Sequence, residues 1–346
     1  MTFARVGCSS EQFCFDSLKN SLDFFVLRAK NRHDGDFCAL ELFSSLQLGV
    51  SMLQEPKLQM IQFPHPIPED SADIRGVKPW NRSAHQRNFI VSPGEAIVAK
   101  GAEPKRFENI SFWGEWEPEA KIVGHFYKSD SPITPRRLIA PLFPKNMPQP
   151  SGDKCCGNTD PFVFGEHFKY SNCLQYFKGR PNRLQYLSAG SLILFGGIRQ
   201  GDFWLDTVFV VKDGLKYKGC DCQNQEMQAF LGADYPFFHA ATLKPIAASS
   251  EMQERHYTLY RGQNWWENPN YFSFVPCDVN ERAFSKVKLS PTMIQKLSKN
   301  PNNYTVLGEY EEPNPTPQAV WEKIVDEVFA QGLFLGVRFD NVLADA

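Results

Sequence analysis

Proline and glycine interrupt this chain often enough to imply many loops and interrupted strands. The 346 residues include 25 Pro and 23 Gly, the residue types that most often mark turns and loops. Short strands between the breaks are therefore expected, rather than a helical bundle. The regular strand–helix alternation of a doubly wound parallel sheet is missing. The pattern predicts an α+β protein with a β-rich central sheet or partly open barrel and flanking helices.

Hydrophobic spacing divides the chain into three expected regions. Residues 1–85 are expected to form a helical region, with helices near 15–26 and 37–48, followed by a proline-rich linker. Residues 86–225 are expected to form a basic β-rich core, and residues 226–346 an α+β region that could be continuous with that core. The expected strands are Glu95–Ala99, Ile122–Tyr127, Leu192–Phe195, Phe203–Val211, His256–Tyr260, Tyr271–Val275 and Leu333–Phe339. The expected C-terminal helices, each preceded by a Ser-Pro or Thr-Pro pair, are Met293–Lys299 and Ala319–Ala330.

Charge is distributed unevenly, although the net charge is only −2. Residues 75–218 carry 21 Lys and Arg against 13 Asp and Glu, whereas residues 219–346 carry 10 against 16. From Phe168 to Gly201 there are five basic residues and no acidic one. Such asymmetry indicates an anionic partner for the middle segment. The alternative is that the acidic ends fold back and neutralise the basic middle within one domain.

Cysteines and apolar runs indicate the compartment. No run of ~18 apolar residues is present, and the first residues do not resemble a secretion signal. The nine Cys are irregularly spaced, so we expect reduced thiols in a cytoplasmic protein without a membrane partner. The pairs Cys155-Cys156 and Cys220-Asp221-Cys222 lack the spacing of a zinc site. The sequence therefore predicts no metal site, and it identifies no cofactor.

Residues 111–127 are the first segment with side chains suited to catalysis. Two Trp flank Glu115 here, and His125 follows ten residues later. A turn could bring Glu115 and His125 together as an acid–base pair. The alternative is a strand whose Trp side chains face the core and whose Glu side chains face water.

Residues 160–175 are the second such segment, and they contain Asp160, His167 and Cys173. Cys173 could act as a nucleophile if His167 and nearby basic residues lower the pKa of its thiol. The alternative is a small buried thiol, which is the commoner environment of a Cys.

The candidate site also includes residues that could bind a nucleotide. Some have aromatic rings that could stack on a base, and others have side chains that could contact phosphates or base edges. These ligand-binding candidates are Trp113, Trp116, Tyr170, Gln175, Arg180, Arg183 and Arg261. Arg261, followed by Ser273 and by Glu309 or Glu311, matches the order of residues that ADP-ribosyltransferases use. Only eleven residues lie between Arg261 and Ser273, which is too short for the helical insert expected between such strands.

Four phrases of the middle segment resemble a group of bacterial proteins. They are FWGEWEP (112–118), TDPFVFGEHFKYSNCLQ (159–175), LSAGSLILFGG (187–197) and FWLDTVFVV (203–211). Over roughly residues 88–212 the chain resembles uncharacterised proteins grouped as nucleotide-modification-associated domains, which lie near DNA-modification and phage-defence genes. The resemblance implies a nucleic-acid or nucleotide partner and identifies no catalytic residue.

The sequence thus leaves three hypotheses for function. The favoured one is a nucleic-acid- or nucleotide-directed protein, in DNA modification or defence against phage, that binds phosphates through the basic middle and bases through aromatic rings. The second is a small-molecule enzyme, such as an ADP-ribosyltransferase-like transferase. The third is a non-catalytic subunit that meets a protein partner through its acidic ends.

Overall fold

Strands dominate the part of the chain that the structure describes. The computed structural model describes residues 56–65, 75–126, 133–149, 156–290, 294, 297–301, 303–309 and 316–344. The helices expected near 15–26 and 37–48, and most of the one expected over 293–299, lie outside these residues. None of the helices described is both long enough and apolar enough to cross a membrane.

The first sheet is organised around a long antiparallel hairpin of β10 (Leu192–Arg199) and β11 (Asp202–Lys218). Gln200 and Gly201 form its turn, both with positive φ, as two-residue hairpin turns require. The first six residues of β10 are all buried, which is typical of a strand covered on both faces. The sheet order is β15-β1-β10-β11-β12-β7, with β14 paired to β11. These further strands are β1 (Gln59–Pro64), β7 (Lys169–Tyr170), β12 (His256–Gly262), β14 (Val287–Leu289) and β15 (Thr305–Glu309).

The second sheet has the order β16-β13-β4-β3-β6-β5-β2. Its central hairpin consists of β3 (Asn88–Ile97) and β4 (Lys105–Gly114), in a register that pairs Asn88 with Gly114. This register places the residues just before β3 beside the residues just after β4, where the candidate site lies. The other strands are β2 (Val77–Lys78), β5 (Ala120–His125), β6 (Arg137–Pro141), β13 (Val275–Asp278) and β16 (Phe334–Phe339). A separate two-stranded hairpin pairs β8 (Tyr176–Phe177) with β9 (Arg180–Pro181).

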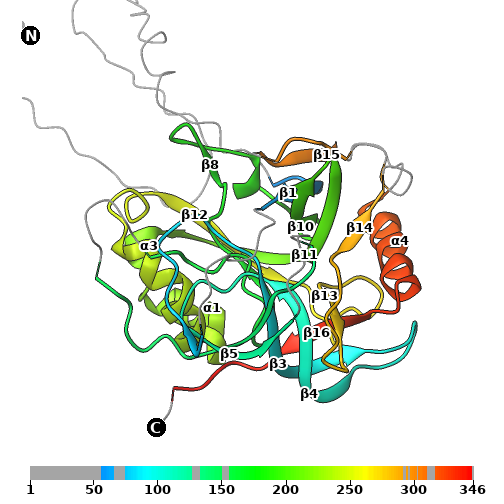
Figure 1. Cartoon of the computed structure of the whole chain (residues 1–346). Coiled ribbons are helices and arrows are strands. Elements are labelled where there is room, and N and C mark those ends of the chain that lie inside the picture. Colours follow the sequence, from blue (N-terminus) through cyan, green and yellow to red (C-terminus); the bar gives the residue numbers. More distant parts are fainter. Residues whose placement is uncertain are drawn as a thin grey trace, which may run out of the picture. The chain divides into compact units, whose positions relative to one another are not determined.

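Helices occupy two sides of the strands (Figure 1). The short helices α1 (Gln225–Leu231), α2 (Tyr235–Phe238) and α3 (Lys244–Ala248) lie between β11 and β12 in the chain. The longest described helix, α4 (Pro317–Ala330), begins where the Thr-Pro pair predicted a helix. The Thr316 hydroxyl accepts a hydrogen bond from the Ala319 amide at 3.1 Å, which satisfies a free amide of the first turn.

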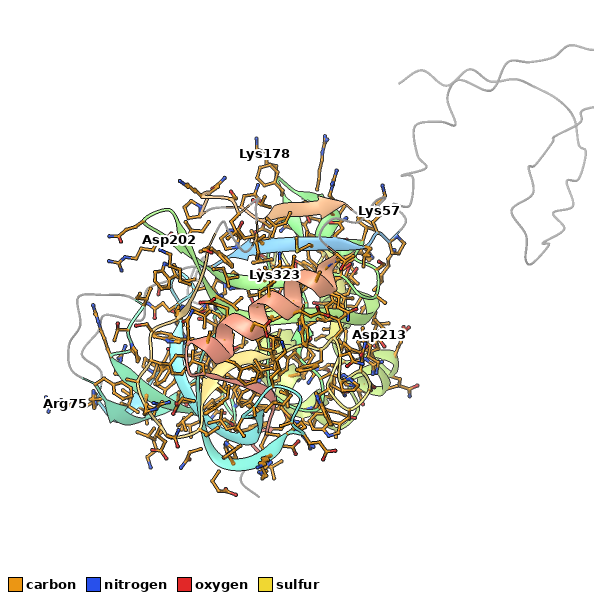
Figure 2. All side chains as sticks on the ribbon, turned by 90° about the vertical axis from the view of Figure 1, so that its right-hand side faces the viewer. Lys57, Arg75, Lys178, Asp202, Asp213 and Lys323 are labelled. Atoms are coloured by element: carbon orange, nitrogen blue, oxygen red, sulfur yellow. The ribbon has the colours of Figure 1, made fainter. Side chains whose placement is uncertain are left out.

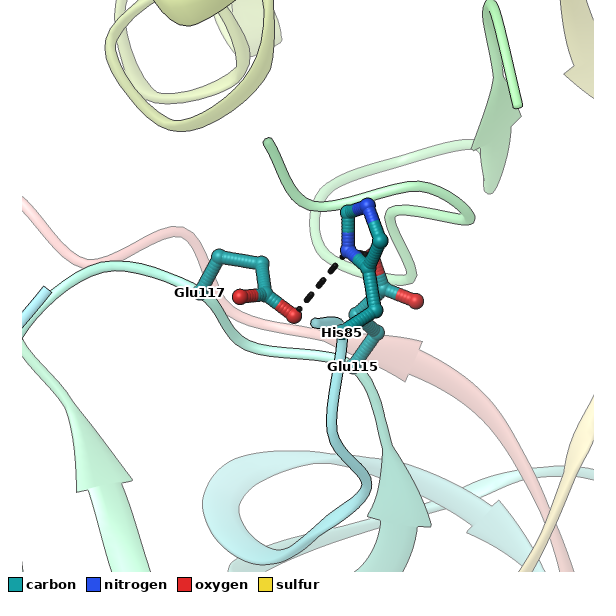
Figure 3. Close-up of side chains that lie close together, drawn as sticks. All are labelled: His85, Glu115 and Glu117. Carbon is teal, nitrogen blue, oxygen red and sulfur yellow. Dashed lines mark hydrogen bonds and ion pairs between the residues drawn. The ribbon is translucent and has the colours of Figure 1, made fainter. Parts of the chain in front are cut away.

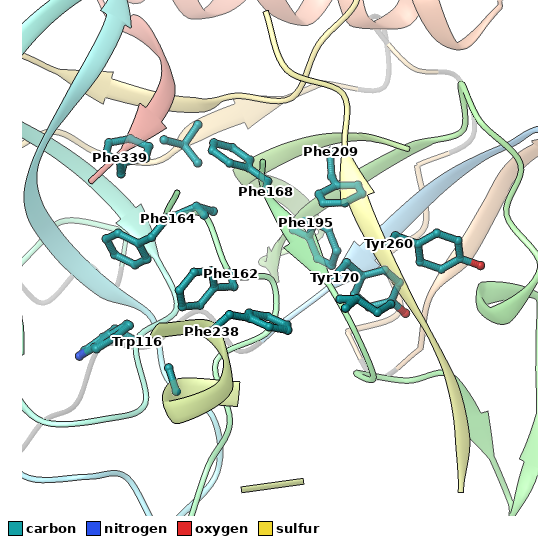
Figure 4. Close-up of a cluster of buried hydrophobic side chains, with 14 of the residues drawn as sticks. Trp116, Phe162, Phe164, Phe168, Tyr170, Phe195, Phe209, Phe238, Tyr260 and Phe339 are labelled. Atoms are coloured by element: carbon teal, nitrogen blue, oxygen red, sulfur yellow. The ribbon is translucent and has the colours of Figure 1, made fainter. Parts of the chain in front are cut away.

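Aromatic side chains from both sheets and from the segment between them form the main core (Figure 4). Phe195 and Phe209 come from the first sheet, and the ring of Phe339 from the second lies 4.1 Å from that of Phe112. Full burial of such a side chain stabilises the fold by about 1.5–3 kcal/mol. Of the 29 Phe of the chain, ten are buried in this core.

Residues 86–225 and 226–346 are interleaved rather than separate. Strands from beyond residue 225 extend both sheets, since β12 and β14 pair with β11 while β16 pairs with β3. Residues 54–346 accordingly form one compact unit. The predicted α+β class is confirmed, because only β1–β10 and β3–β6 pair in parallel among the described strands and no doubly wound parallel sheet is formed there.

Candidate functional site

A cluster of buried charges lies where strands of the two sheets meet. Arg87 immediately precedes β3, Glu115 immediately follows β4, and Asp206 lies on β11. The Arg87 guanidinium donates from Nη1 to Glu115 at 2.5 Å and from Nε to Asp206 at 2.9 Å. The Lys286 ammonium lies 2.8 Å from the other oxygen of Asp206. These side chains are at most 2% exposed, so removing one partner would leave a buried charge uncompensated.

His85 lies at the outer end of this cluster, beside two carboxylates (Figure 3). Its Nδ1 is 3.2 Å from Glu115 Oε1 and 3.3 Å from Glu117 Oε1. Burial disfavours the imidazolium, but the charges of Glu115 and Glu117 outweigh it and raise the pKa of His85 well above its usual value. Figure 3 shows the other ring nitrogen, Nε2, pointing away from both carboxylates. We refer to His85, Arg87, Glu115, Glu117 and Asp206 as the junction cluster.

Glu117 is held by hydrogen bonds to its carboxylate and from its backbone amide. Its Oε2 accepts a hydrogen bond from Asn81 at 2.5 Å, and its backbone amide donates to the Thr159 hydroxyl at 3.1 Å. Gly157 approaches so closely that a Cβ there would lie 2.6 Å from Glu117 Oε2. A glycine is therefore needed at position 157 for the carboxylate to keep this position.

Asp160 is held against the same cluster by backbone groups. Its carboxylate accepts amide hydrogen bonds from Ser171, Asn172 and Cys173 at 2.7–2.9 Å. Its own amide donates to Glu115 Oε1 at 3.1 Å. Burial raises the pKa of Asp160 to about 7, against the lowering effect of the three amides. This carboxyl group therefore exchanges its proton near neutral pH.

A polar pocket of about 320 Å³ opens beside His85. Asn158, Asn172, Tyr176 and Arg255 also line it. Among the described residues that line the pocket none is Asp or Glu, because Glu115 and Glu117 lie behind His85. With His85 protonated, the lining carries two cations and no anion, which favours an anionic ligand.

The same side chains could hold a divalent cation. One donor atom each from His85, Glu115 and Glu117 lies within 4.8 Å of the other two. Imidazole and carboxylate ligands suit metals such as Zn²⁺ or Mn²⁺. A metal ion would have to displace the proton from His85 Nδ1, because only the neutral imidazole is a ligand.

Three of the residues predicted as catalytic come together at this site. They are Glu115, Asp160 and Cys173, linked by the amide hydrogen bonds described above. Cys173 lines the pocket, but burial, followed by the charges of Asp160 and Glu115, raises the pKa of its thiol well above the usual value. It therefore lacks the lowered pKa that an activated thiolate nucleophile needs.

The structure places the other two predicted catalytic residues elsewhere. His125 ends β5 and is exposed. His167 is buried, and its Nδ1 is 2.9 Å from the carbonyl oxygen of Gly262, to which it donates. Neither histidine lines the pocket, so the acid–base pair of Glu115 and the thiol pair of Cys173 are not formed with the predicted partners.

Arg261 lies with His167 in a second polar region, away from the pocket lining. Its guanidinium binds both carboxylate oxygens of Asp213, at 2.9 and 2.5 Å. Ser273 is buried and accepts a hydrogen bond from the Val210 amide at 2.9 Å, while Glu311 lies outside the described residues. Arg261 and Ser273 thus have structural partners within the sheet.

The predicted stacking residues are mostly core residues. Trp113 and Trp116 are 1% and 0% exposed, so neither ring offers a face to a base. Tyr170 is also buried, and its hydroxyl donates to the carbonyl of Cys173 at 2.7 Å. Gln175 is buried and bonds through both ends of its amide to the backbone of Thr258. These four side chains are therefore buried in the interior, whereas Arg180 and Arg183 are exposed.

Many basic side chains of the middle segment are matched by acidic residues of the C-terminal third. These ion pairs are Lys100–Asp326, Arg106–Asp340, Lys169–Asp234, Lys212–Glu267 and Lys218–Glu254. Other basic residues are dispersed, as Figure 2 shows for Arg75 and Lys178 on separate parts of the surface. The charge asymmetry along the sequence therefore does not become one continuous basic surface.

Four members of the junction cluster were not among the candidates from the sequence: His85, Arg87, Glu117 and Asp206. His85 and Arg87 shortly precede an apolar strand, which is a weak signal because many surface loops look alike. The informative fact is the register that pairs Asn88 with Gly114. It brings residue 87 next to residue 115, and no local sequence pattern specifies it.

Comparison with known proteins adds no further assignment. No protein-family model, curated protein or solved structure matches the chain.

Proposed function

We propose that the protein binds a phosphate-bearing nucleotide, free or within a nucleic acid, in the pocket beside His85. The observation that carries the proposal is the lining of this pocket, which combines two cationic side chains with amides and two tyrosine rings and, among the described residues, contains no carboxylate. Its volume of about 320 Å³ lies at the lower end of the range for small-molecule sites, enough for one small ligand.

His85 is the group best placed to contact the phosphate. Glu115 and Glu117 keep its imidazole protonated and oriented through Nδ1, while Nε2 points away from them (Figure 3). A charge-assisted hydrogen bond from Nε2 to an anion would contribute about 1.5–3 kcal/mol. The same imidazolium is suited to donate a proton to a leaving group, as a general acid.

Arg255 and Tyr176 supply the second contact. The guanidinium lies over the Tyr176 ring, 4.7 Å from its centroid, and pairs with the exposed Glu251. Because Glu251 is 71% exposed, this ion pair is weak and can be exchanged for a ligand phosphate. Arg255 thus offers a second cation on the side of the pocket formed by β8 and the residues before β12.

Calorimetric titration with nucleoside monophosphates at low and high salt tests the proposal. We expect binding that weakens as salt rises, and about tenfold weaker binding for His85→Ala and for Arg255→Ala. His125→Ala is the matched control, because His125 is exposed on β5 and does not line the pocket. Absence of binding at low salt, or equal losses in the control, would rule the proposal out.

A divalent-cation site is a second candidate, favoured by the spacing of the donor atoms of His85, Glu115 and Glu117. Mn²⁺ titration followed by electron paramagnetic resonance would detect it. Affinity should rise with pH, because the metal competes with the proton on His85. Glu117→Gln should abolish binding, whereas Glu108→Gln, an exposed residue of β4, should leave it unchanged. Equal Mn²⁺ binding by both variants would exclude the site.

A further inference from the structure

The hairpin of β8 and β9 presents an exposed ring and two cations next to the pocket. Phe177 is 55% exposed, one of the largest apolar side chains at the described surface. Lys178 and Gly179 form the turn, both with positive φ, as expected for a tight two-residue hairpin. The Lys178 ammonium lies over the Phe177 ring, 5.4 Å from its centroid. Arg180 follows on β9 and is exposed.

The base of this hairpin is firmly anchored while its tip projects. The Tyr176 hydroxyl donates to the His256 carbonyl at 3.0 Å and accepts from the His256 amide at 3.1 Å. On the other strand, Asn182 donates to the Leu174 carbonyl at 2.6 Å. Figure 1 shows the β8 hairpin extending outward from the sheets, and Figure 2 shows Lys178 at its outer surface. A rigid base with a projecting tip holds Phe177 in place without burying it.

The hairpin is connected directly to the pocket. Tyr176, the first residue of β8, lines the pocket, and the next residue, Phe177, is the exposed one. Successive side chains of a strand point to opposite sides, so Phe177 lies on the face of β8 opposite to the one that lines the pocket. A nucleic-acid strand leaving the pocket would therefore pass over the edge of the two-stranded hairpin to reach Phe177.

The charge around the tip fits a polyanion. Lys178 and Arg180 belong to the stretch from Phe168 to Gly201 that contains no Asp or Glu. Within the described residues neither of them forms an ion pair with a carboxylate. This distinguishes them from Lys169 of the same stretch, which forms an ion pair with Asp234.

We infer that the pocket receives a nucleotide that is still part of a single nucleic-acid strand, and that the β8–β9 hairpin holds the flanking nucleotide. Phe177 stacks on the neighbouring base, while Lys178 and Arg180 contact its phosphates. The inference rests on the proposed nucleotide-binding function. Of the two ligands allowed there, a free nucleotide or a nucleotide within a nucleic acid, it selects the second. Stacking on an aromatic ring and contact with backbone phosphates are how single strands are bound without sequence preference.

Fluorescence anisotropy with a labelled oligothymidylate of roughly ten nucleotides, in parallel with calorimetry on thymidine monophosphate, tests this. Phe177→Ala should weaken binding of the oligonucleotide about tenfold, since stacking contributes ~1–3 kcal/mol per base. It should leave binding of the monophosphate unchanged. The double variant Lys178→Ala/Arg180→Ala should reduce the salt dependence of oligonucleotide binding. Val123→Ala, another exposed apolar residue at 46%, is the control and should change neither.

The outcomes separate the two proposals. If Phe177→Ala leaves oligonucleotide binding unchanged, or weakens both ligands equally, the strand inference is wrong while nucleotide binding in the pocket stands. If neither ligand binds the unaltered protein, the proposed function fails and the strand inference with it.

Discussion

Two regions of this molecule contain a histidine, an arginine and carboxylates, yet their surroundings give them different chemistry. The junction cluster is defined above, and the second region, which we call the β12 cluster, consists of His167, Lys212, Asp213, Arg261 and Glu267. In the junction cluster the Arg87–Glu115 pair is at most 1% exposed, whereas the side chains of the Arg261–Asp213 pair are 25% and 37% exposed. The comparison shows that residue type alone does not mark a site, because burial decides how strongly the charges act on each other.

The two histidines show the same contrast. Two carboxylates outweigh burial and raise the pKa of His85 well above its usual value. Burial, assisted by Lys212 and opposed by the Gly262 carbonyl and Glu267, lowers the pKa of His167. The raised pKa thus favours the cationic form of His85, and the lowered pKa favours the neutral form of His167, which donates to the Gly262 carbonyl.

The largest difference is expected when the arginines are replaced. Arg87→Met removes the guanidinium that both Glu115 and Asp206 bind and leaves these two buried carboxylates with fewer cationic partners, so we expect a loss of about 3–5 kcal/mol in the free energy of unfolding. Arg261→Met breaks a partly exposed pair and should cost no more than about 1 kcal/mol. Urea denaturation of both variants measures this. Equal losses would mean that the two clusters do not differ in effective burial.

The second-largest difference between the two clusters is expected in how they make the stability of the protein depend on pH. The pKa of Asp160 is raised to about 7 in the folded protein, above the ordinary value of ~3.9 in the unfolded chain. The folded state therefore binds more protons between these values, and stability should fall as pH rises, by roughly 2 kcal/mol between about pH 5 and pH 6.5. Denaturation at several pH values should show this fall in the unaltered protein and in Asp213→Asn. If Asp160→Asn retains the same slope, Asp160 does not cause it.

A smaller difference between the two clusters is expected in the pKa values of their histidines. Histidine NMR resonances should give a midpoint above ~6.5 for His85 and below it for His167. Glu117→Gln should lower the His85 midpoint, since one of the two neighbouring charges is removed. A His85 midpoint at or below that of His167 would contradict the geometry of Figure 3.

The smallest effect is expected at Glu267. It pairs with Lys212 at 2.5 Å and is 37% exposed, so Glu267→Gln should change the free energy of unfolding by less than about 1 kcal/mol. Nucleotide binding should remain unchanged, because Glu267 does not line the pocket. Weakened binding in this calorimetric measurement would indicate that the β12 cluster also takes part in ligand recognition.

Local sequence patterns predicted the helices and strands more accurately than they predicted the residues of the candidate site. The Thr-Pro pair located the start of α4, and the apolar runs Leu192–Phe195 and Phe203–Val211 located β10 and β11, because capping and hydrophobic patterns act over a few residues. Trp113 and Trp116 illustrate the limit. Beside Glu115 they could be interpreted as ligand-stacking residues, but their rings are buried in the core, because a strand between two layers buries its large apolar side chains on either face.

The site residues were predicted only where they lie in segments that are dense in polar side chains. Glu115, Asp160 and Cys173 meet as members of two segments that are conspicuous in the sequence, whereas His85 and Arg87 come from an ordinary loop. His167, although only seven residues from Asp160, bonds to Gly262 instead. Proximity along the chain therefore does not predict proximity in space once strands carry neighbouring residues to opposite sides.

The sequence by itself determined the α+β class, the start of α4 and the two strands of the long central hairpin, since these depend on hydrophobic period and on capping residues within a few positions. Only the tertiary structure decided which charges meet. The pairing of Asn88 with Gly114 brings Arg87 to Glu115, and the folding of the C-terminal third against the middle neutralises much of its basic charge. Both depend on contacts between residues far apart in the chain, and electrostatic interactions become strong only after those contacts have excluded water.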